Sequence, residues 1–500
     1  MADVRLVETS LRDGNQCLWA ALGVDTARTL SIAPVMDRVG FKAIDFTTST
    51  HMGVAVRFKR EDPWERIRLM AAATPNTPLQ FMGTGFRFIS WETASADFMA
   101  LAYRTLARHG IRRFCLADPM NDAEANAANA RLVKQSGGEF VIAALVFTLS
   151  PIHDDAHYAA CARTLAASPD VDALYIKDPG GLLSQKRAAT LIPAIKAAIK
   201  DAMGTGGVEK PLELHSHNTI GLAEMTYLDA PDLGVSALQC ASGAVADGIS
   251  NPPIERIVAN LRSLGHRVDI DDQALAAVSA YFTSLAEAEG LPAGKPQGFD
   301  AAYLHHQLPG GTVGTMRRHL AESRVAHLEG AVLEELDRVR RELGWPIVMT
   351  PFAQMVIAQA VMNVTGGRYN TVPDEIIRYA LGRFGKPNVP IDPEVMARID
   401  SLPRTRELRA EPPMPELPEL RRRVGATLSD EEFLLRATMP GGLVDAMRAA
   451  GPAARHYDPS TRPLMALLSR LLARRDLAQI ELQKPGFRLA LRRGAGAVSA

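Results

Sequence analysis

The feature of this sequence that most constrains its fold is a regular alternation of two kinds of segment between residues 3 and 265. Short apolar runs alternate there with longer amphipathic stretches in which apolar residues recur near a period of 3.6. This alternation is typical of repeated βα units, whose strands form a parallel sheet. The apolar runs number eight and cover residues 5–9, 43–47, 79–82, 113–117, 141–147, 173–176, 212–215 and 237–240. Eight such units in about 260 residues predict an α/β fold, the (β/α)8 TIM barrel.

The residues after the barrel lack the strand rhythm. Helical patterns occupy 274–289, 330–343 and 351–362, and a proline-rich stretch begins at Glu411. Beyond that stretch the pattern favours further helices, including one over 463–475, and a frayed tail from Arg492. The sequence therefore predicts three domains: a barrel over residues 1–265, an all-α domain over 266–404 and a C-terminal helical extension over 405–500.

The charge balance argues against a nucleic-acid or membrane partner. Lysine and arginine together number 56, and aspartate and glutamate also number 56, so the formal net charge is zero. The four cysteines are far apart and form no Cys-x-x-Cys pair, which disfavours a disulfide framework and a cysteine-rich zinc site. No apolar run approaches the roughly 18 residues of a membrane span. We expect a cytoplasmic protein with reduced thiols, no membrane insertion and a small-molecule substrate.

Four polar side chains interrupt the apolar runs where the barrel strands are predicted to end, and that end of a barrel carries the active site. They are Asp13, Lys177, His215 and His217. Residues i and i+2 of an extended segment face the same side, so His215 and His217 can share one cation, and Asp13 can add a carboxylate oxygen. Two histidines at a strand end can instead bond to neighbouring loops, and Lys177 can either pair with Asp178 or carry a carbamate formed with carbon dioxide. The residues alone leave these alternatives open.

Five longer segments stand in a fixed order along the chain: Thr9-Ser-Leu-Arg-Asp-Gly-Asn-Gln, Phe114-Cys-Leu-Ala-Asp-Pro-Met-Asn-Asp, Ile176-Lys-Asp-Pro-Gly-Gly-Leu-Leu, Leu214-His-Ser-His-Asn-Thr-Ile-Gly and His306-Gln-Leu-Pro-Gly-Gly. They resemble the signature segments of the biotin-dependent carboxyltransferase family. That family includes the carboxyltransferase domain of pyruvate carboxylase and the alpha subunit of oxaloacetate decarboxylase, within the barrels related to hydroxymethylglutaryl-CoA lyase. The resemblance extends over residues 3–400 and implies a (β/α)8 barrel followed by a helical funnel domain.

The resemblance also implies a site, its cofactors and its partners. The four strand-end residues would hold a divalent metal such as zinc, manganese or cobalt, with Lys177 carboxylated by carbon dioxide, and Arg12 and Gln16 would act in catalysis and line the substrate pocket. Biotin would arrive on a separate carrier, because the printed sequence contains no Met-Lys biotinylation motif. The partners implied are a biotin carboxyl carrier protein and a biotin carboxylase subunit, and the chain is expected to form a homodimer.

The sequence departs from the family at two positions. The family's proton-shuttling threonine lies in a Gly-Gly-Thr-Ser-Gln-Pro-Pro segment, and this chain has Asp247-Gly-Ile-Ser-Asn-Pro-Pro, which places Ile249 at that catalytic position. An alkyl side chain cannot relay a proton. The family's carboxylate-binding arginine lies in Leu-Leu-Arg-Gly, and Phe81-Met-Gly-Thr places Gly83 there, with Arg87 close enough to compensate. We therefore expect a less cationic, more apolar pocket and a substrate other than pyruvate, such as a neutral ketone or an aromatic compound.

Three functions are compatible with these residues. The leading one is the carboxyltransferase subunit of a multi-subunit biotin-dependent carboxylase, which moves carbon dioxide between carboxybiotin and a small carbonyl compound. The second is a biotin-independent, metal-dependent lyase or aldolase, and the third is a non-catalytic scaffold subunit of a carboxylase complex. A biotinylated carrier that copurifies with the chain would favour the first over the second, and turnover by the reconstituted complex would favour it over the third.

Overall fold

The computed structural model describes residues 1–90, 93–308, 310–322, 324–349 and 351–458, and beyond them 467–468, 471, 474, 477, 479–484 and 487–492. The chain divides into two compact units, Met1–Ala453 and Ala454–Ala500. The predicted domain boundaries at residues 265 and 404 both fall inside the first unit and stay predictions. Most of the helix predicted over 463–475 lies outside the described residues, as does the tail after Arg492.

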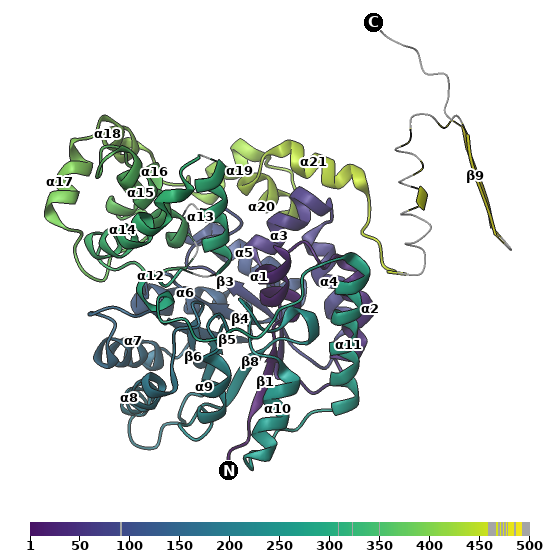
Figure 1. Ribbon diagram of the computed structural model, residues 1–500, viewed down its shortest axis with the longest axis horizontal. Helices are drawn as coiled ribbons and strands as arrows, with labels where there is room; N and C mark the ends of the chain where they lie inside the picture. The colour runs from purple at the N-terminus through teal and green to yellow at the C-terminus, as the bar shows by residue number, and fades with distance from the viewer. Residues whose placement is uncertain are drawn as a thin grey trace, which may run out of the picture. The chain divides into compact units, whose positions relative to one another are not determined.

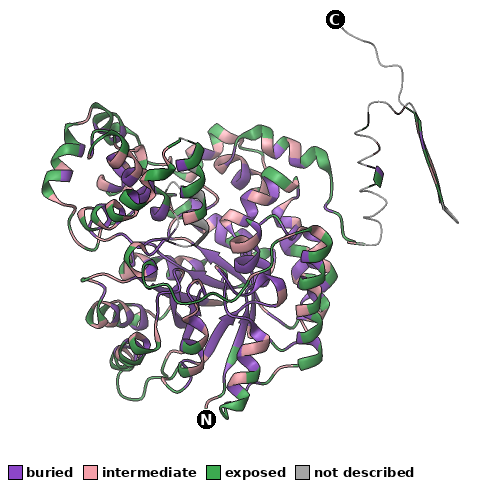
Figure 2. Cartoon of the chain, viewed as in Figure 1, coloured by how far each residue is buried: buried purple, intermediate pink, exposed green. Residues whose placement is uncertain are grey.

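Eight parallel strands close into a barrel in sequence order, and β1 pairs with both β2 and β8. Helices surround the strands (Figure 1), and the strands are almost entirely buried (Figure 2). Each strand overlaps the apolar run predicted for it, so the (β/α)8 barrel is confirmed. The strands are β1 (Arg5–Glu8), β2 (Ala43–Thr48), β3 (Leu79–Gly83), β4 (Ile111–Leu116), β5 (Phe140–Val146), β6 (Ala173–Asp178), β7 (Leu212–Ser216) and β8 (Ala237–Cys240).

The helices of the barrel begin at capping side chains that the sequence supplies. An aspartate or serine precedes several of them, and its side chain accepts a hydrogen bond from a backbone N–H of the first turn, which stabilises a helix by about 1 kcal/mol. These caps are Asp25 for α2 (Thr26–Met36), Asp62 for α4 (Pro63–Ala73), Ser95 for α5 (Ala96–Arg108), Asp122 for α6 (Ala123–Gln135), Asp154 for α7 (Asp155–Ala167) and Ser184 for α8 (Gln185–Met203). The remaining barrel helices are α1 (Asn15–Trp19), α3 (Ser49–Val54), α9 (Ala223–Asp229) and α10 (Ile254–Ser263).

A long connection between α11 (Asp272–Glu289) and α12 (Tyr303–His306) follows the loops at the carboxyl ends of the strands. It touches in turn the loops that follow β1, β8, β6 and β5. The hydrogen bonds that fix it join Trp19 Nε1 to Pro292 O (2.8 Å), Gly294 N to Ala244 O (2.9 Å), Tyr303 Oη to Gly180 O (2.7 Å) and Thr148 Oγ1 to Gln307 Oε1 (3.0 Å). The helical region is thereby anchored around the mouth of the barrel, where the candidate site residues were predicted.

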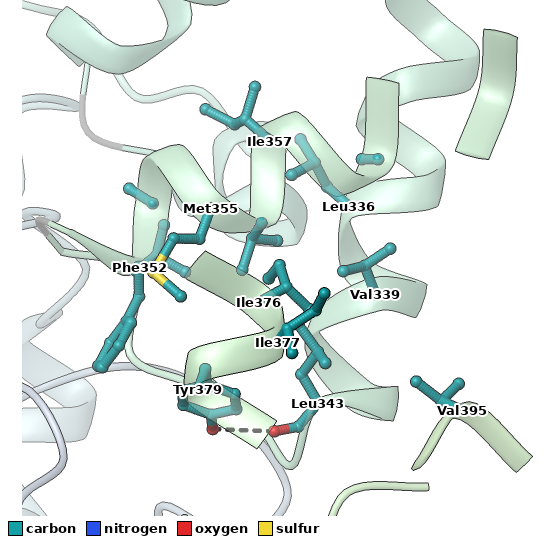
Figure 3. Close-up of a cluster of buried hydrophobic side chains, with 14 of the residues drawn as sticks. Leu336, Val339, Leu343, Phe352, Met355, Ile357, Ile376, Ile377, Tyr379 and Val395 are labelled. Atoms are coloured by element: carbon teal, nitrogen blue, oxygen red, sulfur yellow. Dashed lines mark hydrogen bonds between the residues drawn. The ribbon is translucent and has the colours of Figure 1, made fainter. Parts of the chain in front are cut away.

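The helices between residues 310 and 410 pack around a second hydrophobic core (Figure 3), and three further helices follow them. Leu336 and Val339 of α14 meet Phe352 of α15 and Ile377 of α16 there, and each fully buried side chain of this kind contributes about 1.5–3 kcal/mol. The hydroxyl of Tyr379 donates to the carbonyl of Leu343 at 2.9 Å, so the polar group in this core is satisfied. The helices are α13 (Gly310–Glu322), α14 (Glu329–Glu342), α15 (Phe352–Gly366), α16 (Asp374–Ala380), α17 (Pro393–Ser401), α18 (Pro403–Ala410), α19 (Leu417–Val424), α20 (Asp430–Thr438) and α21 (Gly441–Ala450).

Among its described residues, the second unit contains two strands that the helical extension predicted over 405–500 did not include. It contains an antiparallel hairpin of β9 (Gln479–Lys484) and β10 (Phe487–Arg492), in which Ile480 pairs with Leu491 and Leu482 with Leu489. The apolar residues alternate with polar ones at a period of two, which is the strand pattern. None of the helices in the described part of the chain is long and apolar enough to cross a membrane.

Candidate active site

Three of the predicted metal ligands meet at the mouth of the barrel. Asp13 Oδ2 lies 2.8 Å from His217 Nε2 and 3.4 Å from His215 Nε2, and the two imidazole rings are 5.2 Å apart between centroids. Asp13 belongs to a short π-helical segment, Ser10–Gly14, directly after β1, while His215 lies in β7 and His217 just beyond it. All three side chains are buried. The i, i+2 relation of the two histidines therefore places both on the side of Asp13, as the sequence predicts.

A chain of hydrogen bonds through two polar side chains inside the barrel orients the ring of His215. Its Nδ1 is 3.0 Å from Gln239 Oε1, and Gln239 Nε2 donates to Glu213 Oε2 at 3.4 Å. Because the amide oxygen can only accept, His215 carries its proton on Nδ1, and Nε2 presents a lone pair to Asp13. That Nε2 is buried and has no hydrogen-bond partner among the described residues. Burial and the nearby Lys177 lower the pKa of His215 to about 3, so the ring is neutral and free to bind a cation.

A substitution at Gln239 tests this orientation. In Gln239→Leu, His215 Nδ1 loses its acceptor and the ring is free to rotate. We expect a 10- to 100-fold weaker affinity for a divalent cation, which is the usual effect of removing a group that orients a metal-binding histidine. The affinity is measured by competition with a chromogenic chelator, and Gln239→Glu, which keeps the acceptor, is the matched control. Equal affinities in the Leu and Glu variants would show that Gln239 does not orient His215.

Arg12 lies next to this cluster and balances its negative charge. Its guanidinium forms ion pairs with Asp13 and with Asp45 of β2, and its Nε is 2.7 Å from Asp45 Oδ2. Burial disfavours ionisation of Asp13, but the charges of Arg12 and His217 outweigh it and hold the pKa of that carboxyl well below its usual range. Asp13 is therefore an ionised oxygen donor. Arg12, which the resemblance assigns to the substrate pocket, also holds Asp13 in place.

Lys177 ends β6 with its side chain in the same cavity as Arg12 and Asp13. Burial and the charge of Arg12 lower its pKa, which favours the neutral amine that can react with carbon dioxide. The adjacent Asp178 accepts hydrogen bonds from Leu182 N, Leu183 N and Ser216 Oγ at 2.7–2.9 Å. No ion pair joins Lys177 to Asp178 in the described part of the chain, so the simple pairing considered from the sequence is not formed.

A cavity of about 270 Å³ opens beside these residues at the barrel mouth. Two polar atoms that line it, Gln16 Oε1 and Ser49 Oγ, are buried and make no hydrogen bond within the described residues. A buried polar atom without a partner costs about 1–3 kcal/mol, so both are available to bind a ligand. Gln16 was predicted as a substrate contact from the sequence. Ser49 was missed, because as the first residue of α3 it has the sequence context of an ordinary helix start.

The cavity carries several cationic side chains, and the expectation of a pocket less cationic and more apolar than the family's stays a prediction. Arg57 and Arg87 line it together with Arg12, and Asp13 is the carboxylate among its described lining residues. Arg87 donates to the carbonyl of Phe384 at 3.2 Å and its guanidinium stacks on the ring of Phe384, 5.3 Å from the centroid. The expectation rests on Ile249 and Gly83, whereas the arginines that line the cavity come from the loops after other strands and from other positions in them.

The position predicted for the family's carboxylate-binding arginine, Gly83, does not face the cavity. A Cβ added to Gly83 would meet Leu116, Phe81 and the hydroxyl of Tyr103, so this position faces the surrounding helices. Its neighbours Met82 and Thr84 line the cavity, because side chains alternate along a strand. Gly83 therefore does not line the cavity, whereas its neighbour Thr84 does. Ile249 lies half-buried in the loop after β8, and neither it nor Gly83 is among the described residues that line the cavity.

One lining residue comes from the helical region rather than the barrel. Met349 reaches the cavity, and with Ile347 it packs against barrel residues such as Tyr175 and Ala144. The segment before α15 thus closes part of the barrel mouth. Nothing in the sequence signals this contact, because it joins residues more than 170 positions apart.

The donors at the barrel mouth fit a divalent cation. Two imidazoles and an ionised carboxylate are a common ligand set for zinc and related ions, and the unpartnered lone pair of His215 faces the carboxylate. The carboxyl ends of the strands of a (β/α)8 barrel are where the enzymes of this fold place their active sites. Fold and site together define the chain as a barrel enzyme whose centre can bind a metal.

Comparison with known proteins narrows this class. The family described as "Conserved carboxylase domain" matches residues 304–464. The chain is 33% identical over 398 residues to a pyruvate carboxylase subunit of Methanocaldococcus jannaschii, covering 79% of this chain and 68% of that one. It is 31% identical over 397 residues to the large subunit of 2-oxoglutarate carboxylase of Hydrogenobacter thermophilus, covering 79% of this chain and 59% of that one.

The fold is also found among solved structures. The carboxyl transferase domain of Rhizobium etli pyruvate carboxylase, solved with pyruvate and biocytin, matches with a TM-score of 0.80 and 21% sequence identity, covering all of this chain and 86% of that one. At this identity the likeness concerns the fold. With the sequence relatives, the conclusion is plain: the chain belongs to the biotin-dependent carboxyltransferase family, and it is an enzyme of that family.

Proposed function

We propose that this protein is the carboxyltransferase subunit of a multi-subunit biotin-dependent carboxylase. It moves a carboxyl group between carboxybiotin on a separate carrier protein and a small carbonyl compound that itself bears a carboxylate. The observation that carries the proposal is the cavity at the barrel mouth, where arginines and unpartnered polar atoms lie beside a metal-type donor set. Relatives named as subunits of pyruvate carboxylase support an assembly with a biotin carboxylase subunit.

We assign the metal ligands to Asp13, His215, His217 and a carbamate on Lys177. A divalent metal bound there would act as a Lewis acid that polarises the carbonyl oxygen of the substrate. Arg12 keeps Asp13 ionised and oriented, and Gln239 presents the lone pair of His215. The carbamate gives Lys177 a negative charge, which removes the repulsion between an ammonium group and a cation.

The cavity also indicates how the substrate is held. The guanidinium groups of Arg57 and Arg87 can bind a carboxylate, and Gln16 and Ser49 can bond to polar groups beside the reacting carbon. We therefore propose a 2-oxo acid and no longer a neutral ketone or an aromatic compound. Thr84, which lines the cavity without a guanidinium, and the isoleucine at the position that the resemblance assigns to the proton-shuttling threonine favour a 2-oxo acid other than pyruvate. The relatives named as pyruvate carboxylase subunits favour pyruvate itself.

A substrate-preference experiment discriminates between these two. The double variant Thr84→Arg, Ile249→Thr restores a guanidinium at the cavity wall and a hydroxyl at the place of the family's threonine. We expect its ratio of kcat/KM for pyruvate to kcat/KM for larger 2-oxo acids to rise about 10²-fold, the lower range of what a general acid–base group contributes. Thr84→Arg, Ile249→Val is the control, since valine has the shape of threonine without the hydroxyl. A wild-type protein that already prefers pyruvate would refute the part of the proposal that excludes it.

The carrier partner is tested by copurification. Capture on monomeric avidin from a native extract of the source cells is expected to recover this chain with a biotinylated protein, and elution with free biotin is expected to release both. Capture of the biotinylated protein without this chain, together with substrate turnover by the chain alone, would favour the metal-dependent lyase or aldolase. A complex that contains the chain but works equally well without its cavity residues would favour the scaffold.

A further inference from the structure

A thiol lies beside the metal-type donors and has no role in the function proposed above. Cys17 belongs to α1, one helical turn after Asp13, so the i, i+4 relation places both side chains on the same face. Cys17 is half-buried and lines the same cavity as Asp13 and His217. The sequence offers no Cys-x-x-Cys pair to draw attention to it.

The donor atoms of these three residues form a compact cluster. The sulfur of Cys17, a carboxylate oxygen of Asp13 and a ring nitrogen of His217 all lie within 4.8 Å of one another. Around a tetrahedral zinc ion, bond lengths of about 2.0–2.3 Å place pairs of N, O and S donors roughly 3.3–3.6 Å apart. A side-chain movement of about 1 Å is therefore enough to bring the sulfur to one ion with the other donors.

A fourth atom points independently to a cation at this place. His215 Nε2 is fully buried, has no hydrogen-bond partner within the described residues and lies 3.4 Å from Asp13 Oδ2. That separation is about the spacing of two donors on one tetrahedral ion. Neither Cys115 nor Cys161 belongs to this group of donors. Cys115 is inside the barrel, where its Sγ donates to Tyr175 Oη at 2.9 Å, and Cys161 lies on α7.

We propose that Cys17 is a fifth protein ligand of the same divalent ion, beside the four of the proposed function, so that the centre combines thiolate sulfur with imidazole nitrogen and carboxylate or carbamate oxygen. The inference rests on the metal site of the proposed function and goes beyond it in the kind of metal selected. On binding, the metal–sulfur bond forms and the thiol proton leaves to solvent. Thiolate ligands favour zinc or cobalt over manganese and magnesium, which prefer oxygen. The thiol also makes the centre sensitive to oxidants in a way that an oxygen and nitrogen site is not.

Cobalt substitution tests this ligand without reference to activity. The full-length protein is stripped with a chelator and titrated with Co²⁺ while the absorption spectrum is recorded. Wild type is expected to bind one equivalent and to develop a near-ultraviolet charge-transfer band from sulfur to cobalt. Cys17→Ser is expected to bind cobalt with its visible bands retained and the charge-transfer band lost, and to gain relative affinity for Mn²⁺ over Zn²⁺. Cys161→Ser is the matched control and is expected to keep the band.

The outcomes separate this inference from the proposed function. Stoichiometric cobalt binding without a charge-transfer band in wild type would overturn the role of Cys17 and leave the metal site standing. A band that persists in Cys17→Ser would overturn it equally. Absence of any stoichiometric cobalt would overturn both the ligand and the metal site on which it depends. Circular dichroism of Cys17→Ser confirms that the near-isosteric serine leaves the barrel folded.

Discussion

The double variant His215→Ala, His217→Ala is expected to lose its divalent cation and at least about 10³-fold in carboxyl-transfer rate, because a metal contributes several kcal/mol of transition-state stabilisation. Both imidazoles face Asp13, and removing them leaves too few donors to hold an ion. The fold is expected to survive, since the unpaired Gln239 costs only about 1–3 kcal/mol. Elemental analysis gives the metal content, and circular dichroism gives the fold.

A matched control uses two histidines away from the site. His305 and His327 are exposed, so His305→Ala, His327→Ala removes the same number of imidazoles from the protein surface. This control is expected to retain the metal and the full rate. Native protein without stoichiometric metal, or a double site variant that keeps it, would show that the ligand assignment is wrong.

The largest effect on stability is expected at Arg113, near the amino-terminal end of the barrel interior. Its guanidinium is 2.6 Å from Glu213 Oε1 and 2.7 Å from Gln80 Oε1, and all three side chains are buried. Arg113→Ala leaves the Glu213 carboxylate with Lys42 as its remaining cation, at 2.7 Å. Breaking a buried ion pair from one side costs about 3–5 kcal/mol, so the free energy of unfolding is expected to fall by that amount.

The neighbouring arginine provides the comparison. Arg112 pairs with Glu139, but both side chains are more than half exposed. Arg112→Ala is therefore expected to change the free energy of unfolding by no more than about 0.5 kcal/mol. Urea denaturation followed by circular dichroism measures both variants. If the two substitutions lower the free energy of unfolding equally, the buried ion pair of Arg113 with Glu213 stabilises the barrel no more than a surface ion pair does.

The barrel could be predicted from the sequence because its buried strands and the helices between them alternate regularly along the chain. Each strand is an apolar run, and the helices between them begin at Asp or Ser caps. The second unit is different, since β9 and β10 alternate apolar and polar residues, and this alternation was overlooked. A strand of that kind forms no continuous apolar run, so it does not stand out as the barrel strands do.

The candidate site was predictable only where the chemistry is local. Asp13, His215 and His217 stand at strand ends, and the i, i+2 spacing places both imidazoles beside the carboxylate. The substrate side was not predictable in the same way. Gly83 was predicted at the substrate side, but Thr84 is the residue of the two that lines the cavity, because the direction of a side chain at a strand end depends on register, which the strand's own residues do not reveal.

The residues that reach the cavity from distant elements were not predicted from the sequence. Met349 comes from the helical region, and Arg57 from the segment after α3. Their place at the site depends on how the loops pack around the barrel mouth. Met349 and Arg57 come together only when the barrel has closed and the connection between α11 and α12 has packed around its mouth.

The measurement that tests this account most directly is transfer of a labelled carboxyl group in a defined mixture. The purified chain, loaded with zinc, is combined with a biotinylated carrier protein that a biotin carboxylase has carboxylated beforehand with ATP and ¹⁴C-bicarbonate, and a series of 2-oxo acids is supplied in turn. We predict that acid-stable label appears in a dicarboxylic or tricarboxylic product only when the chain, the carrier and the correct 2-oxo acid are all present. Loss of the same label with the chelator-stripped protein or the His215→Ala, His217→Ala variant is predicted as well. Product formation that is equally fast without any biotinylated protein, or no transfer to any 2-oxo acid in the presence of all components, would contradict the account.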